Sequence, residues 1–180
     1  MRGLPTLVFA ILLGLPITAA GADNATQFSG VPAVLPSGTL MIEGHEVTLW
    51  GIDPLARDQK CWQGNVAWDC GEQALTALRH YITGHAVRCE VKSGSSAQCF
   101  RKQSGKEDDI AGWLTSQGWA RDKQGVSDGL YADAEEDARA SRRGIWTSRF
   151  QTAEDWKNGI PHYVQYDPAP PKRAIPAGAQ

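Results

Sequence analysis

Four cysteines constrain the fold of this 180-residue chain more than any other feature, because their spacing limits how it can be cross-linked. They are Cys61, Cys70, Cys89 and Cys99, and four cysteines leave three disulfide connectivities open. Local geometry favours the pairing of neighbours. Cys89 and Cys99 flank "EVKSGSSAQ", whose centre predicts a hairpin turn at Gly94, and the other two flank the polar loop "WQGNVAWD". The sequence therefore predicts two local disulfides, each contributing about 2–4 kcal/mol.

A structural zinc site is the alternative use of four cysteines. Such sites take pairs of ligands roughly two to four residues apart, and neither neighbouring pair here is that close. An even number of cysteines in a chain bound for an oxidising compartment favours disulfides instead.

The N-terminal stretch "MRGLPTLVFAILLGLPITAAGADN" has the three parts of a secretory signal. Arg2 gives the basic end, residues 4–15 form a short apolar run, and residues 20–22 offer a small-residue cleavage site. We expect residues 1–22 to be a signal peptide and the mature protein to be periplasmic or secreted. The alternative is an uncleaved membrane anchor, for which the apolar run is short. After cleavage we expect no stable membrane span.

The charge balance does not favour nucleic acid as a partner. The formal net charge is −2, and signal removal takes Arg2 and none of the 20 acidic side chains. Proteins that bind phosphate backbones normally present a basic face. The nearest cluster is Arg139, Arg142 and Arg143, which we interpret as a solvated helix end.

The mature chain begins with an expected flexible segment, residues 23–30. Residues 31–53 alternate apolar and turn residues and predict two or three antiparallel strands, with a hairpin turn at "EGHE". Asp69 and Glu72 match a helix capping box, and the apolar spacing behind them predicts a helix over about residues 71–82.

Two strands, "AVRCEV" and "AQCFRK", follow as the disulfide hairpin, and helices are expected in "DDIAGWLTSQGWA" and in "SDGLYADAEEDARASRRGIW", the latter ending at Gly144. Residues 151–180, with proline and alanine concentrated toward the end, are expected to be largely disordered. The order of elements predicts an α+β fold over residues 31–150, a five-stranded OB-type β-barrel with three helices.

The segments "TLMIEGHEVTLWGID", "CGEQALTALRHYITGHAVRCEV", "DDIAGWLTSQGWA" and "YADAEEDARASRRGIW" together resemble the thermonuclease family, typified by staphylococcal nuclease. The resemblance covers residues 34–150 and implies the same OB-type fold. It implies nuclease chemistry only if the family's functional residues are present.

The chain departs from that pattern at nearly every functional position. Active members carry Asp-Gly-Asp-Thr in the first strands, where this chain has "PSGT", so Gly38 replaces a calcium-binding carboxylate. The position of the first phosphate-binding arginine is Thr48, and the position of the candidate general base is Ala56. The turn between the hairpin strands, "KSGSSAQ", lacks the second arginine, and Arg101 does not match by position. Asp53, in "WGIDP", is the one ligand retained.

These losses remove most of what phosphodiester hydrolysis requires. Calcium takes roughly six to eight oxygen ligands. Loss of a charge-stabilising donor costs on the order of 10²–10³ in rate, and loss of a general base about 10²–10⁴. We therefore expect no intact catalytic set and no cofactor, with Asp53 a remnant of a metal site. Calcium enters only in an alternative, a site rebuilt around Asp53 with Asp58 and Arg57.

Other polar candidates are weaker. Glu43 and Glu46 are expected to face solvent on their hairpin. The histidines show no shared metal-ligand spacing and no evident partner for general base catalysis; they are His45, His80, His85 and His162.

Seven tryptophans suggest ring stacking with sugars or bases. Those inside predicted elements are expected to be core, namely Trp50, Trp113, Trp119 and Trp146. Trp62 and Trp68, in the disulfide loop, are the candidate contact surface.

Three functions follow. The favoured one is an exported nuclease-like domain without phosphodiesterase activity that binds a partner, an envelope protein or a polysaccharide. The chain also resembles, in size and layout, small nuclease-like exported proteins that accompany succinoglycan synthesis in rhizobia, which implies a role in exopolysaccharide biosynthesis. The alternatives are a weak calcium-dependent nuclease acting on DNA or RNA, and a cell-envelope protein-interaction module.

Overall fold

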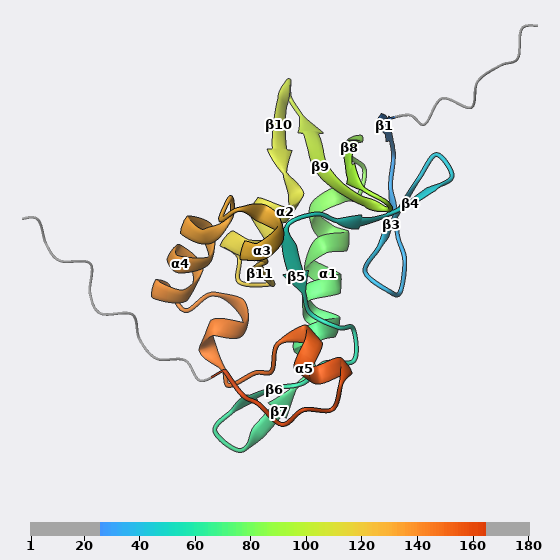
Figure 1. Ribbon diagram of the computed structural model, residues 1–180. Coiled ribbons are helices and arrows are strands. Elements are labelled where there is room, and N and C mark those ends of the chain that lie inside the picture. Colours follow the sequence, from blue (N-terminus) through green and yellow to red (C-terminus); the bar gives the residue numbers. More distant parts are fainter. Residues whose placement is uncertain (1–25, 165–180) are drawn as a thin grey trace, which may run out of the picture.

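The computed structural model describes residues 26–164, which form a mixed α+β arrangement (Figure 1). The main sheet has seven strands in the order β1-β8-β9-β4-β3-β2, with β10 paired to β9. Its strands are β1 (Gln27–Gly30), β2 (Ala33–Val34), β3 (Leu40–Ile42), β4 (His45–Leu49), β8 (Val87–Ser93), β9 (Ser96–Gln103) and β10 (Lys106–Asp109). Only the β4–β9 pairing is parallel within this sheet.

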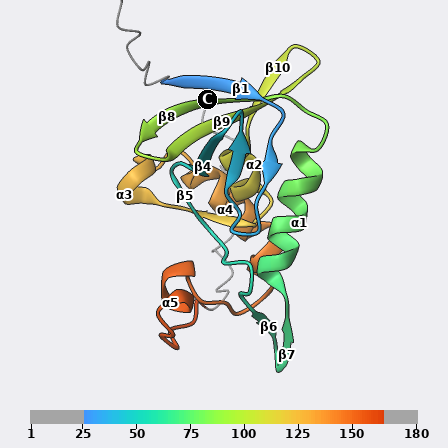
Figure 2. The same ribbon diagram turned by 90° about the vertical axis from the view of Figure 1, so that its right-hand side faces the viewer.

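Two smaller ladders join β5 (Ile52–Pro54) to β11 (Ala120–Asp122) and β6 (Cys61–Gln63) to β7 (Val66–Trp68). The helices are α1 (Cys70–Ile82), α2 (Ile110–Ser116), α3 (Gln124–Ser127), α4 (Ala132–Ala140), α5 (Ala153–Lys157) and the 3-10 helix η1 (Gly144–Thr147). In both views the β6–β7 ladder and α5 lie at the end of the molecule opposite β10 (Figures 1 and 2).

Both predicted hairpins are confirmed. Glu43 and Gly44 connect β3 to β4 with φ angles of 48° and 82°, the two positive values that a type I′ turn requires. In the β8–β9 hairpin Cys89 lies opposite Cys99, and Ser93 lies opposite Ser96. The turn therefore falls at Gly94, as its sequence predicts.

Helix α1 matches the helix expected over residues 71–82, because Ala74, Leu75, Leu78 and Ile82 bury one face. The helix-start pattern of Asp69 and Glu72 correctly marks where α1 begins, with Asp69 as the N-cap residue, but the capping-box hydrogen bonds do not form. Asp69 makes no side-chain capping bond and pairs with Lys60, while Glu72 accepts a 2.7 Å hydrogen bond from Arg57. The two carboxylates thus bind cationic side chains of the preceding loop instead of the first backbone amides of α1, because charge-assisted hydrogen bonds are stronger.

The last expected helix is shorter than predicted and corresponds to α4, with α3 ending where the predicted segment begins and η1 starting at Gly144. Asp128 and Gly129, with φ angles of 52° and 80°, separate α3 from α4. Arg142 and Gly144, with φ angles of 53° and 55°, separate α4 from η1. Positive φ is incompatible with a continuous right-handed helix, so α4 starts only after Gly129, later than expected, and ends before Gly144, where the sequence predicts a stop.

The expected count of five strands and three helices is also corrected, because the described residues contain a seven-stranded sheet and five α-helices. The pairings do not form a closed barrel. However, β1 and β2, which end the strand order on opposite sides, are separated along the chain only by Val31 and Pro32.

The folded domain extends beyond both limits expected from the sequence. Strand β1 lies within the segment expected to be flexible, and α5 lies within the tail expected to be disordered. The predicted signal peptide, residues 1–22, lies outside the described residues, as does the tail after residue 164.

Two hydrophobic clusters hold these elements together. The main core joins the sheet to α1 and α2 and includes Leu40, Ile42, Leu78, Val87 and Ile110. Each such side chain contributes about 1.5–3 kcal/mol when fully buried. The second cluster is centred on the Cys61–Cys70 disulfide with Ala138, Ile145, Trp146 and Phe150, and it fixes the β6–β7 end of the molecule.

Candidate functional site

Asp53 lies in the middle of β5, directly opposite Arg121 of β11. The turn before it depends on Gly51, which has a φ of 78°. A Cβ at this position would lie 2.8 Å from the Tyr131 ring, so glycine allows the strand end to pass close to Tyr131. The "WGID" sequence therefore places the carboxylate at a fixed point beside the β5–β11 ladder.

The environment of Asp53 does not favour its ionised form. Burial raises the pKa of this carboxyl, while the charge of Arg121, the Ala153 backbone N–H and Lys123 oppose that shift. A metal-binding carboxylate requires a site where negative charge is concentrated. Around Asp53 the charges are mixed, because Arg121 and Lys123 lie near the carboxyl together with Glu154.

Asp53 forms part of the wall of a cavity of about 460 Å³, which we call the strand-end cavity. Its apolar wall comes from α1, α2 and their surroundings and includes Leu55, Leu75, Leu78, Leu114 and Trp119. Hydroxyl side chains enter from the sheet and its loops, namely Ser37, Thr39, Thr48, Ser93 and Ser96.

The positions that the thermonuclease resemblance marks as functional converge on this cavity. Gly38, Thr48, Asp53 and the hairpin-turn residues Ser93 and Ser96 all line it, although they come from three separate segments of the chain. Ala56 does not line it, whereas its neighbours Leu55 and Arg57 do. The structure thus brings the marked positions together and gives them small or hydroxyl side chains.

The charged groups lining the strand-end cavity are Asp53, Arg57 and Lys123. This set carries a net positive charge at neutral pH, so the cavity disfavours a divalent cation and accommodates a neutral or anionic ligand. Arg57 is already paired with Glu72 at 2.7 Å, and Thr39 donates a 2.8 Å hydrogen bond to Glu46.

The alternative calcium site around Asp53 and Asp58 finds no support in these positions. Asp58 is exposed and accepts a hydrogen bond of 3.2 Å from the Trp156 indole. Within residues 26–164, no group of three or more His, Cys, Asp and Glu side chains is arranged to hold a metal ion.

The histidines are spread over the surface. His45 stacks on Phe28 with ring centroids 4.6 Å apart, and His162 lies 3.1 Å from the Asp155 carboxylate. His80 is exposed, and His85 is partly exposed just beyond α1. None of the four lines the strand-end cavity.

The tryptophans divide differently from the sequence-based expectation. Trp146 is buried, as predicted, but Trp50, Trp113 and Trp119 are half-buried and pack against the edge of the main core. Trp50 and Trp119 also line the strand-end cavity. Sequence reasoning missed this because a helix or strand position does not reveal which side of a tryptophan remains open.

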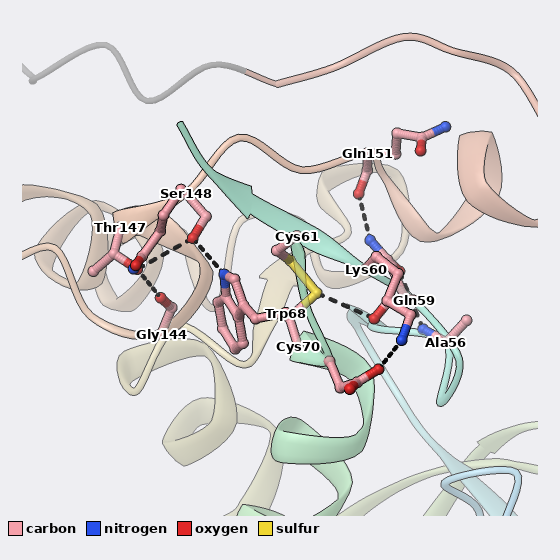
Figure 3. Close-up of a disulfide and its surroundings, with 12 residues drawn as sticks. Ala56, Gln59, Lys60, Cys61, Trp68, Cys70, Gly144, Thr147, Ser148 and Gln151 are labelled. Atoms are coloured by element: carbon pink, nitrogen blue, oxygen red, sulfur yellow. Dashed lines mark hydrogen bonds and ion pairs between the residues drawn. A yellow bond between two sulfur atoms is a disulfide. The ribbon is translucent and has the colours of Figure 1, made fainter. Parts of the chain in front are cut away.

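The two loop tryptophans have unequal surroundings. Trp62 contacts Tyr163 and Trp156, with ring centroids 5.2 Å and 6.5 Å away, so the C-terminal segment covers much of it. Trp68 packs edge-on to Trp119 with centroids 6.5 Å apart and donates a 2.9 Å hydrogen bond to Ser148 (Figure 3).

The four cysteines form the two disulfides expected from the sequence, Cys61–Cys70 and Cys89–Cys99, and all four are buried. The bonded sulfurs leave no thiolate for zinc, so the zinc alternative is excluded. Beside the first disulfide, the buried Gln59 side chain donates to the Gln151 backbone oxygen at 2.7 Å (Figure 3). The segment after residue 150 is thereby tied to the loop that follows β5.

A second cavity, of about 630 Å³, lies on the other side of Asp53 and is bounded by α5. Its charged groups alternate in sign and are Asp53, Arg121, Asp122, Lys123, Glu154 and Lys157. Their charges cancel, so this cavity shows no preference for an ion of either sign.

No helix within the described residues combines the length and the apolar character needed to cross a membrane.

No known protein-family profile matches the chain. A search of curated proteins finds the succinoglycan biosynthesis protein ExoI of Rhizobium meliloti (strain 1021), which is 31% identical over 147 residues. The match covers 78% of this chain and 75% of that protein, so it includes most of the folded domain.

Proposed function

The chain belongs to the family of the succinoglycan biosynthesis protein ExoI, and on that basis we propose that it serves exopolysaccharide biosynthesis as an exported binding or accessory protein without phosphodiesterase activity. The absence of phosphodiesterase activity is proposed from the residues of the strand-end cavity. This cavity gathers the positions that the thermonuclease resemblance marks, and apart from Asp53 these are glycine, threonine and serine.

The loss of hydrolytic chemistry follows from what these side chains can do. Hydroxyl groups donate and accept hydrogen bonds, but they supply neither the carboxylate ligands of calcium nor the fixed positive charge that stabilises a phosphoryl transition state. Asp53 alone, with a raised pKa and cationic neighbours, is a poor metal ligand. The cavity retains a shape and polarity suited to binding.

Two observations support descent from a thermonuclease-type OB barrel. The first is the convergence of the marked positions described above. The second is the strand order, because one short segment, residues 27–34, pairs with β8 at one end and with β3 at the other. Such a segment is what closes a small barrel, and here Val31 and Pro32 interrupt the ladder.

Export is supported by the two disulfides, since such bonds persist in oxidising compartments. The disulfides hold the two structures nearest the cavity rims, the β8–β9 hairpin and the loop leading into α1.

The test is genetic complementation in the host. Deletion of the gene is expected to reduce or alter exopolysaccharide, and the wild-type gene should restore it. Thr48→Trp, which fills the strand-end cavity from an exposed position of β4, should fail to restore it at normal protein level. The matched control is Thr76→Trp, at an exposed α1 position outside the cavity lining, which should restore it. Unchanged exopolysaccharide in the deletion strain would refute the proposed role.

A further inference from the structure

A shallow groove of about 430 Å³ lies between the β6–β7 ladder, the start of α1 and η1, and we call it the tryptophan groove. Its principal side chains are Gln63, Trp68, Gln73, Trp119 and Thr147. We propose that this groove binds neutral sugar rings of a glycan chain. The inference rests on the proposed function and specifies the ligand class.

The chemistry of the groove is that of a neutral, hydroxyl-rich ligand. Every side chain lining it is uncharged. Amides donate and accept hydrogen bonds at once, as sugar hydroxyls do, so glutamine matches them without favouring a charge. Indole faces attract the weakly positive C–H groups on the apolar face of a sugar ring.

The two indoles form a corner. Trp68 and Trp119 lie with ring centroids 6.5 Å apart and planes at 73°, which leaves differently oriented faces beside the groove. A ring stacked on one indole would therefore contact the edge of the other, a geometry that a single exposed tryptophan cannot offer.

A hydrogen-bond network holds this corner in place (Figure 3). The Trp68 indole donates to Ser148 Oγ at 2.9 Å, and the Ser148 and Thr147 hydroxyl oxygens lie 3.3 Å apart. Gln63 Nε2 donates to Thr147 Oγ1 at 3.1 Å, and Thr147 Oγ1 lies 3.0 Å from the Gly144 carbonyl. Because the β6–β7 ladder supplies Gln63 and Trp68 and η1 supplies Thr147 and Gly144 between them, the plane of the Trp68 indole is set before any ligand binds.

The amides retain capacity for a ligand. Gln63 uses Nε2 in the network and keeps its carbonyl oxygen as an acceptor. Gln73 is exposed, and its side chain forms no hydrogen bond within residues 26–164. These two amides face the groove from β6 and α1 respectively.

The groove leads toward the strand-end cavity. Trp119 lines both, and the α1 residues Gln73 and Ala74 line one each. A glycan whose neutral rings lie in the groove would thus extend over Trp119 toward the strand-end cavity, where Lys123 supplies positive charge for an anionic substituent.

The test is titration of the oxidised protein with neutral hexasaccharides, namely cellohexaose, laminarihexaose and maltohexaose, with hexagalacturonic acid as an acidic comparison. The readout is the NMR signal of each tryptophan indole N–H, assigned with Trp68→Phe and Trp119→Phe. At least one neutral probe should shift the Trp68 and Trp119 signals saturably. Gln73→Ala should weaken that binding roughly threefold to tenfold, as expected for loss of one hydrogen bond. Thr76→Ala, on the same helix but outside the groove, should leave it unchanged.

The proposal is overturned if no neutral probe gives a saturable shift, if only the Trp50 signal responds, or if Gln73→Ala binds as tightly as wild type. These outcomes are separable from failure of the proposed function. A deletion strain with altered exopolysaccharide and a groove that binds no neutral sugar would reject the groove alone.

Discussion

Within residues 26–164, Asp53 is the only acidic residue lining the strand-end cavity, and its surroundings explain why it is an unsuitable calcium ligand. It lies opposite Arg121 in the β5–β11 ladder, and Lys123 reaches both cavities beside it. Burial raises the pKa of the carboxyl more than these cations lower it, so the folded state binds the proton more tightly than the unfolded chain does.

That shift has a defined consequence for stability. The group stabilises the fold fully at acid pH, and the contribution is lost as pH rises from near the ordinary value of 3.8 through the raised folded-state pKa. The free energy of unfolding of Asp53→Asn, taken relative to that of wild type, should therefore be lower at acid pH than at neutral pH. Urea unfolding between pH 3.5 and about pH 8 measures the difference.

The control for this pH series is Asp155→Asn. The pKa of Asp155 is lowered by hydrogen bonds from Thr152 and His162, so its contribution is present at neutral pH and lost as pH falls. The two variants should show opposite pH trends. Identical trends would contradict the assigned environment of Asp53.

Asp109 illustrates how one side chain can join several elements. It caps α2 by accepting hydrogen bonds from the Ala111 and Gly112 amides at 2.9 and 3.2 Å. Its other oxygen accepts from Gln98 of β9 at 2.7 Å and from the Tyr131 hydroxyl at 2.9 Å. The same Tyr131 ring lies against Gly51, so the cap also supports the turn before Asp53.

Asp109→Ala removes the cap and leaves two donors without an acceptor. We expect a loss of about 2–4 kcal/mol in the free energy of unfolding, measured by urea denaturation. Asp109→Asn keeps an oxygen acceptor and should lose clearly less. Equal stability of the alanine variant and wild type would show that the cap does not hold these elements.

The sequence predicted the elements whose signals are local. The β3–β4 and β8–β9 turns, the disulfide partners and α1 are all set by residues within about a dozen positions of each other. The late start of α4 was missed although Asp128-Gly129 is a local turn signal whose two residues adopt positive φ. Helix α5 was missed although its start signal is local, because Thr152 caps the Asp155 amide and Glu154 and Asp155 lie in its first turn.

The candidate site could be predicted only in part, because it combines residues from distant segments of the chain. Its marked positions came from the family resemblance, and they do converge. The role of Trp119 could not be predicted from its own segment. The two cavities that it lines are formed with residues of α1 and with Trp68, which are distant in sequence.

The two disulfides stabilise different parts of the whole molecule. Cys89–Cys99 lies in the main core, while Cys61–Cys70 belongs to the second cluster and holds the β6–β7 end. Both close loops of similar length, with sequence separations of 10 and 9 residues.

Replacing either cysteine pair by alanine should therefore cost a similar amount, about 2–4 kcal/mol. The local effects should differ. The Cys61/Cys70 variant should lose amide exchange protection at Trp62 and Arg149, which exchange backbone hydrogen bonds of 2.9 and 2.8 Å, before it unfolds globally. The Cys89/Cys99 variant should keep the exchange protection of the Trp62 and Arg149 amides until it unfolds globally. Hydrogen exchange by NMR distinguishes the two, and identical local protection in both variants would refute the division.

The account depends most on the claim that the strand-end cavity binds without hydrolysing. The direct measurement incubates the oxidised protein with single-stranded DNA and RNA, with and without calcium, beside Asp53→Ala. We predict no cleavage above the protein-free control under any condition. Calcium-dependent cleavage that disappears in Asp53→Ala would contradict the account.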